Sequence, residues 1–183
     1  YGLQKMSSDH AEVRDLLSAL AIKVRSCEED FNAQNVSNAL YGLQKMSSDH
    51  AEVRDVLSAL AIKVQSCKEN FNAQNVGNAL YGLQKMNSSH AEVRDVLSAV
   101  AVKVRSCKEV LNAKAVGNAV YGLQKMSSDH AEVRDLISAL AIKVRSCSED
   151  FSAQAVANAL YGLQKMSSDH VEVRDLLSGL TMR

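Results

Sequence analysis

The chain has 183 residues, of which 21 are basic and 21 are acidic, and 46% of its residues are hydrophobic. The zero net charge provides no overall field that would attract nucleic acid or an anionic membrane surface. The sequence also lacks an apolar run of about 18 residues, so we expect no membrane insertion.

A period of 40 residues runs through the whole chain. The hexapeptide Tyr-Gly-Leu-Gln-Lys-Met begins at residue 1 and returns at 41, 81, 121 and 161. Periods of this length are typical of solenoids, in which each repeat buries its apolar face against its neighbours. We expect one array that belongs to a longer one, because both ends fall inside a copy. Its copies are 1–40, 41–80, 81–120, 121–160 and the partial copy 161–183.

A long amphipathic segment is the first predicted element of each copy, at 10–27, 50–67, 90–107 and 130–147. Asp49 and Glu52 form an acidic variant of a capping box at its start. Two apolar stripes predict a helix packed on two sides, as in the interior of a solenoid. In the second copy the large stripe holds Val53, Val56, Leu57, Leu60, Val64 and Cys67, and the reverse stripe holds Ala51, Ala59 and Ile62.

One cysteine ends this segment in each full copy, at Cys27, Cys67, Cys107 and Cys147. Equivalent positions in a helical stack lie about 8–10 Å apart, whereas a disulfide needs Cα atoms closer than about 7 Å. We therefore expect buried, reduced thiols. Such thiols favour a reducing compartment, the cytoplasm or an organelle interior.

A shorter helix follows, predicted from Ala33 to about Met46, with Asn32 as its N-cap. Its apolar positions recur at helical spacing, and polar positions follow the opposite side. The absence of proline from the chain agrees with two helices per copy. The predicted fold is all-α, an α-solenoid of about four and a half two-helix repeats.

The polar side of the shorter helix is the candidate binding surface. Amide side chains can hydrogen-bond to the edges of bases, tyrosine can stack on a base, and lysine can bind phosphate. Single-stranded RNA is therefore one interpretation. Protein binding is a second, and a solvated inner face with Asn side chains bonded to one another is a third. The candidate residues are Gln34, Asn38, Tyr41, Lys45, Gln74, Asn78, Tyr81, Lys85, Lys114, Asn118, Tyr121, Lys125, Gln154, Asn158, Tyr161 and Lys165.

Few positions vary between copies, and two of them flank the shorter helix. The first holds Asn, Asn, Ala and Ala at residues 35, 75, 115 and 155. The second holds Ser, Gly, Gly and Ala at residues 37, 77, 117 and 157. Such variation tunes either a binding code or the packing between repeats.

No feature of the sequence predicts catalysis, a cofactor or a metal site. Ser, His, Asp and Cys recur in register along the array, whereas an active site needs one asymmetric constellation. The His row, His10, His50, His90, His130 and His170, has one residue per repeat. Side chains about 8–10 Å apart do not share a zinc ion with bonds of about 2 Å, so we expect exposed residues in a helix's first turn.

The stretch from Leu43 to Arg54 resembles the turn of HEAT repeats, where an Asp-containing turn leads into Val-Arg. That resemblance implies a right-handed α-solenoid with Asp and Arg bonded between neighbouring repeats. The usual proline of the first HEAT helix is absent, and Ser89 replaces the Asp in the third copy. The implied ladder consists of Asp9, Asp49, Asp129 and Asp169 with Arg14, Arg54, Arg94, Arg134 and Arg174.

The stretch from Gln34 to Leu43 is similar to a helix of octotricopeptide-like repeats in organellar RNA-associated proteins. This second resemblance also implies an α-solenoid, but it implies RNA as the ligand. Function is therefore open between two classes. The first is a non-catalytic scaffold that binds a protein through its inner face or its open ends, as an accessory subunit of a larger assembly. The alternative is an organellar single-stranded RNA-binding protein.

The two ends of the array are not specialised for solvent. Their apolar stripes keep the internal pattern, and open apolar side chains favour association, so we expect end-to-end self-association or coverage of each end. The stripes are Val13, Leu16, Leu17, Leu20 and Val24 at one end and Val173, Leu176, Leu177 and Leu180 at the other.

Overall fold

The computed structural model describes residues 2–181, without the side chains of residues 2 and 4. Within that range the chain is all-helical, with nine α-helices and no strand. A short 3₁₀ helix, η1 (Gly2–Lys5), precedes them. The α-helices are α1 (Ala11–Ser26), α2 (Ala33–Gly42), α3 (Ala51–Ser66), α4 (Ala73–Gly82), α5 (Ala91–Ser106), α6 (Ala113–Tyr121), α7 (Ala131–Ser146), α8 (Ala153–Gly162) and α9 (Val171–Thr181).

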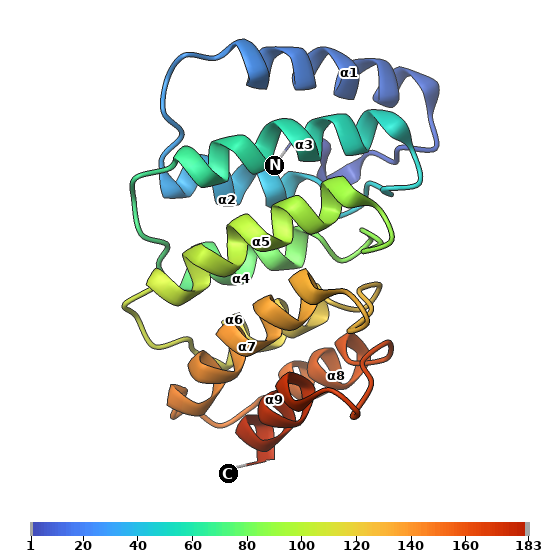
Figure 1. Ribbon diagram of the computed structural model, residues 1–183. Helices are drawn as coiled ribbons and strands as arrows, with labels where there is room; N and C mark the ends of the chain where they lie inside the picture. Colours follow the sequence, from blue (N-terminus) through green and yellow to red (C-terminus); the bar gives the residue numbers. More distant parts are fainter. Residues whose placement is uncertain (1, 182–183) are drawn as a thin grey trace.

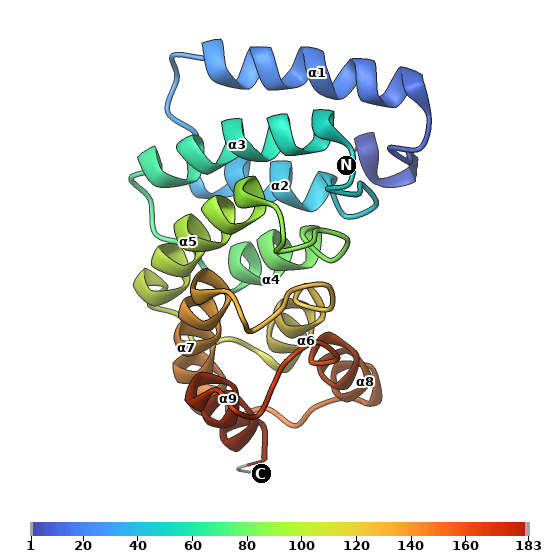
Figure 2. The ribbon, with the colours of Figure 1, turned by 45° about the vertical axis from the view of Figure 1, so that its right-hand side comes forward.

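The helices form two layers (Figure 1). Each long helix packs on the next long helix, from α1 through α3, α5 and α7 to α9, and each short helix packs on the next short helix. Figure 2 shows that the stack curves, with the short helices α2, α4, α6 and α8 on the inner side of the curve. The predicted stack of repeated helical hairpins is confirmed.

One continuous core lies between the layers, and it contains the large apolar stripe of every internal long helix. The reverse stripe is predicted correctly only in part, because Ala59 is buried while Ala51 is exposed and Ile62 is 58% exposed. A long helix has neighbours on two sides and the short-helix layer beneath it. Its fourth side faces solvent, and Ile62 lies there.

The short helices begin where the sequence predicts, but they end earlier than predicted. The Asn32 side chain accepts a hydrogen bond from the amide of Asn35 at 2.8 Å, as an N-cap does. The helix stops at Gly42 rather than at Met46, because the next amides bond three residues back, as that of Met46 does to Leu43 at 2.8 Å. Residues in such a turn advance by about 120° instead of about 100°, so Lys45 leaves the polar face.

The capping box predicted for the long helices is wrong. His50 occupies the N-cap position and makes no side-chain capping bond. The Asp49 carboxylate instead accepts a hydrogen bond from the Ser47 hydroxyl at 2.9 Å. Glu52 lies 3.8 Å from the guanidinium of Arg14 in the preceding repeat. The Asp49 carboxylate therefore stabilises the turn, and the Glu52 carboxylate contacts the preceding repeat; neither caps the N-terminus of α3.

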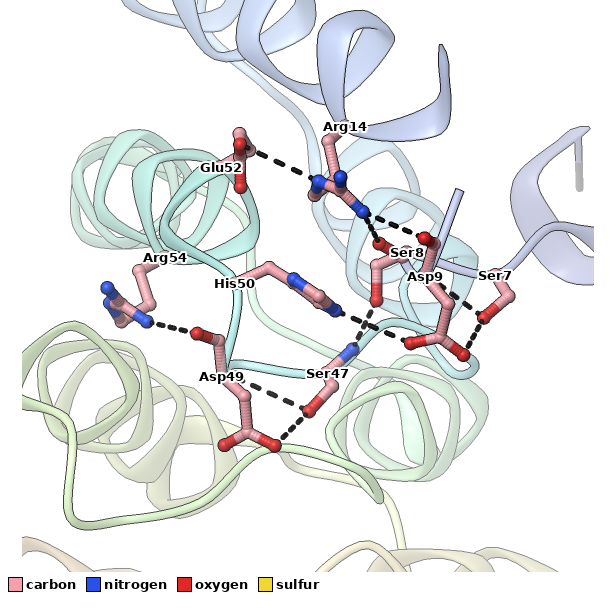
Figure 3. Close-up of polar contacts among 9 residues, drawn as sticks. All are labelled: Ser7, Ser8, Asp9, Arg14, Ser47, Asp49, His50, Glu52 and Arg54. Carbon is pink, nitrogen blue, oxygen red and sulfur yellow. Dashed lines mark hydrogen bonds and ion pairs between the residues drawn. The ribbon is translucent and has the colours of Figure 1, made fainter. Parts of the chain in front are cut away.

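A polar ladder joins the turns of neighbouring repeats (Figure 3). Arg14 donates to the carbonyl oxygens of Ser8 and Asp9, each at 2.9 Å, and ion-pairs with Glu52. The Asp9 carboxylate lies 3.4 Å from His50 Nε2. The Asp–Arg ladder implied by the HEAT resemblance is therefore replaced by an Arg–Glu row and an Asp–His row. Their other members are Arg54–Glu92, Arg94–Glu132, Arg134–Glu172, Asp49–His90 and Asp129–His170.

A second set of contacts caps helix ends across the stack. Lys103 is only 8% exposed as a residue, and its ammonium donates to the carbonyl oxygens of Cys67 and Glu69 at the end of α3. A cation there satisfies carbonyls that the helix leaves without partners and matches its dipole. The equivalent Lys63 and Lys143 donate to Cys27 and Cys107. The carboxylates of Glu69, Glu109 and Glu149 accept from the first amides of α2, α4 and α6, at 3.0, 2.9 and 2.9 Å.

Candidate functional site

Stacked tyrosines mark the inner side of the short-helix layer. The ring centroids of Tyr41 and Tyr81 lie 5.8 Å apart, those of Tyr81 and Tyr121 5.5 Å, and those of Tyr121 and Tyr161 5.7 Å. The planes of neighbouring rings differ by 30°, 21° and 26°. The predicted alignment of these tyrosines is confirmed, and each ring packs against the ring of the next repeat.

Glycine makes this close approach possible. A Cβ atom on Gly82 would overlap the carbonyl of Leu40 and lie 2.7 Å from the amide nitrogen of Tyr41. Gly122 and Gly162 face Leu80 and Val120 in the same way. The short helices therefore touch through their backbones immediately beside the tyrosines, and that contact sets the spacing of the rings.

Amide side chains lie on the same helices, one and two turns before each tyrosine. They line a groove of about 400 Å³ that runs across α4, α6 and α8 to α2. We call this surface the inner groove. It is lined by Tyr41, Asn78, Tyr81, Lys114, Asn118, Tyr121, Gln154 and Asn158. The adjoining hollows add Gln34, Asn38 and Gln74.

The side-chain amides of the inner groove have no partners within the described part of the chain. The Asn side chains, Asn38, Asn78, Asn118 and Asn158, are half-buried, yet their amides bond no other described residue. The same holds for the side chains of Gln34, Gln74, Lys114 and Gln154, which are exposed. The hydrogen bonds expected between neighbouring Asn side chains are therefore wrong. Half-buried amides that face a groove are available to a ligand.

The lysines at 45, 85, 125 and 165 are exposed, but they do not belong to this groove. They lie in the turns after the short helices. The pKa of the Asp9 carboxyl is held below its ordinary value by the Ser7 hydroxyl bond, then by His50, with a smaller effect from the charge of Lys85. Lys125 acts in the same way on the pKa of Asp49, after the dominant Ser47 bond. The structure thus divides the predicted site: glutamines, asparagines, tyrosines and Lys114 come together, and the other lysines lie apart in the turns.

The variable positions of the short helices lie at contacts between repeats, and Asn75, Gly77, Ala115 and Ala155 also line the hollows beside the inner groove. The buried Asn75 amide donates to the Ser37 hydroxyl of the preceding repeat at 2.9 Å. At the next junction Gly77 faces Ala115, and a Cβ atom there would lie 3.2 Å from the Ala115 Cα. The residues are matched across these two contacts, so their variation affects the packing between repeats.

The His and Cys rows each contribute one residue per full repeat along the stack. His50, His90, His130 and His170 are half-buried, contrary to the expected exposure, because they lie against the preceding turn; His10 is exposed. Among the described residues no three His, Cys, Asp or Glu side chains converge as metal ligands would. All four cysteines are free, and the expected burial is confirmed for Cys67, Cys107 and Cys147, with Cys27 half-buried.

The end helices are open to different degrees. Leu17, Val173 and Leu176 are buried by their own neighbours, so the expectation that they are uncovered is wrong. Leu16 and Leu177 are exposed, and Leu160 on α8 is 70% exposed although its equivalents inside the stack are fully buried. In the described range, no helix combines the length and the apolarity needed to cross a membrane.

Comparison with family models, with curated proteins and with solved structures finds no match to this chain. Function is therefore inferred from the groove and its chemistry.

Proposed function

We propose that the chain is a non-catalytic repeat scaffold that binds a protein partner along the inner groove. The observation that supports this most directly is the continuous row of half-buried amides, unpartnered among the described residues, on the inner side of a curved stack. Curved solenoids use such extended concave surfaces for binding. The repeat type we propose is HEAT-like, on the strength of its turn sequence and of the polar ladder between turns.

RNA is the weaker candidate because the tyrosines are already stacked on one another. Successive bases in a strand are about 3.4 Å apart, so a base between two rings needs about 6.8 Å. The ring centroids are only 5.5–5.8 Å apart. Lys85 and Lys125, which would meet phosphates, lie near Asp9 and Asp49 in the turns. Both features favour a polypeptide over a nucleic acid.

The open ends are the other surface on which a partner could dock. Their exposed residues, such as Leu16 and Leu160, are the ones that internal repeats bury against each other. Further repeats of the same kind would cover them equally well. We therefore propose that the protein partner binds in the inner groove, because adding further repeats would cover the ends of the stack but not the groove.

A competition between ligand classes tests this proposal. The immobilised chain is offered a cell lysate at about 50 mM and about 200 mM salt, and retained protein and RNA are both quantified. The groove variant Asn78→Leu with Asn118→Leu is compared with Gln65→Leu, which changes an exposed amide on the outer helix α3. We expect wild type and the control to retain the same proteins at both salt concentrations and the groove variant to lose them.

Retention of RNA that disappears at the higher salt concentration would contradict the proposal. The variant Lys85→Ala with Lys125→Ala then identifies the surface. If those lysines meet phosphates, the salt slope of RNA binding falls by about one unit for each phosphate that is no longer neutralised. If the protein proposal is right, that variant retains the same proteins as wild type.

A further inference from the structure

We propose that the inner groove binds an extended polypeptide segment through its main chain and selects an acidic side chain at one position. This inference rests on the proposed protein-binding function and adds the conformation and the chemical class of the bound segment.

The chemistry of the groove matches a peptide backbone. The side-chain amide of Asn or Gln carries a carbonyl acceptor and an N–H donor in one plane, the same pair that each peptide group presents. Asn78 and Asn118 present such groups from neighbouring short helices, with Gln74 and Gln154 beside them. None of these amides is bonded to another described residue. Main-chain recognition of this kind gives affinity without demanding a particular sequence.

The tyrosine spacing beside the groove is somewhat shorter than the two-residue advance of an extended chain and approaches that of a twisted one. An extended strand advances about 6.6 Å for every two residues, and less when it is strongly twisted. Beside the groove, the tyrosine rings of successive short helices have centroids 5.5–5.8 Å apart. Alternate residues of an extended chain point the same way, so each short helix meets one such residue. The four helices α2, α4, α6 and α8 accommodate a segment of about eight residues.

Charge distinguishes one position of the groove. Lys114 replaces the glutamine found at 34, 74 and 154, and it has no ion-pair partner among the described residues. None of the described carboxylates lines the groove around it. At the α2 end, Glu69 lines a hollow, but its carboxylate accepts the amide of Ala33. An acidic side chain opposite Lys114 therefore meets a single cation among neutral amides.

Three pools of labelled nine-residue peptides test the inference. Each pool is degenerate in Ala, Ser, Thr and Val, and its central residue is Glu, Gln or Lys. A fourth pool repeats the Glu pool with alternate residues N-methylated, which removes main-chain donors while retaining the side chains. Binding is followed by fluorescence anisotropy up to about 1 mM protein sites, the upper limit of weak specific affinity. A labelled twelve-nucleotide uridine strand serves as the nucleic-acid probe.

We expect the Glu pool to bind at least about tenfold more tightly than the N-methylated pool, since each missing hydrogen bond is worth a severalfold change. The variant Asn78→Ala with Asn118→Ala should weaken the Glu pool at least about tenfold. Alanine favours helix at both positions, so the fold is kept. The variant Lys114→Gln should abolish the preference for the Glu pool over the Gln pool. The matched control Gln65→Ala, on the outer layer, should bind as wild type does.

Three outcomes would overturn the inference, and they point to different causes. Equal binding of the Glu and N-methylated pools, with weaker binding in the Asn variant, would show a protein-binding groove that does not read the main chain. Binding of the uridine strand alone would reject the proposed function as well. No binding by any pool, together with specific protein capture that the Asn variant abolishes, would show that the groove takes a folded surface.

Discussion

Replacing Gly82 by alanine tests the packing that holds the tyrosine row together. The new Cβ atom would overlap the Leu40 carbonyl and lie 2.7 Å from the Tyr41 amide nitrogen, whereas ordinary contact begins at 3.4 Å. Both obstacles are backbone, so α2 and α4 must move apart by roughly an ångström. Overpacking costs about 1–3 kcal/mol, and the upper part of that range applies where no side chain can yield. The better helix propensity of alanine offsets at most about 1 kcal/mol.

The net expectation for Gly82→Ala is a decrease of about 2 kcal/mol in the free energy of unfolding. Gly42 is a matched control, because it occupies the same position of the repeat and a Cβ atom there meets nothing within 4 Å. Gly42→Ala should therefore leave stability unchanged or raise it by up to about 1 kcal/mol. Urea unfolding followed by far-UV circular dichroism measures both. Equal stabilities for the two variants, within about 0.5 kcal/mol, would refute the backbone contact.

Three further perturbations probe other contacts. Lys103→Met leaves buried carbonyls at the end of α3 without a donor and should lower the free energy of unfolding by about 2–3 kcal/mol. The control Lys23→Met changes an exposed lysine whose ammonium has no partner among the described residues. It should lower the free energy of unfolding by less than about 0.5 kcal/mol in the same urea assay. The folded pKa values of Asp9 and Asp49 lie below the ordinary 3.8, so their carboxylates stabilise the fold above that pH and the stabilisation disappears as the pH falls through the folded values. Asp9→Asn should make unfolding less pH-dependent below 3.8, and an unchanged acid profile would contradict the Ser7 and His50 contacts. A maleimide should modify the half-buried Cys27 first and the three buried thiols only after unfolding, as read by intact mass; a mass that shows a disulfide would contradict the stacking geometry.

The helices and the two-layer stack follow from the repeat because each copy restates the same amphipathic pattern. The sequence predicts the long helix to within a residue, since its apolar stripe is long and its ends are fixed by turn residues. It predicts the short helix too long because apolar spacing continues past Gly42, while the backbone amides that follow bond three residues back instead of four. This change in hydrogen bonding occurs even in α2, where a Cβ atom on Gly42 would meet nothing within 4 Å, so it does not depend on a contact with a preceding repeat.

The contacts between repeats are the least predictable part. The sequence predicts that Glu52 caps its own helix together with Asp49, but Glu52 forms an ion pair with Arg14 of the preceding copy. Lys103 reads as a polar residue on a helix surface, although it caps α3. The invariant lysine inside an apolar stripe is the signal that could have revealed this role. For the candidate site, helical periodicity places the amides and tyrosines correctly, and it misplaces Lys45, Lys85, Lys125 and Lys165 because they follow the end of the helix.

An NMR titration that observes the groove amides themselves is the decisive test of peptide binding. The chain is labelled with nitrogen-15 in asparagine only, and the side-chain NH₂ signals are assigned by single substitutions. On addition of the Glu-centred peptide pool, we predict that the signals of Asn78 and Asn118 shift together and saturate at one concentration. The signal of Asn87, in the turn before α5, should stay in place. Shifts confined to residues outside the groove, or no shift at saturating peptide, would contradict a peptide-binding groove.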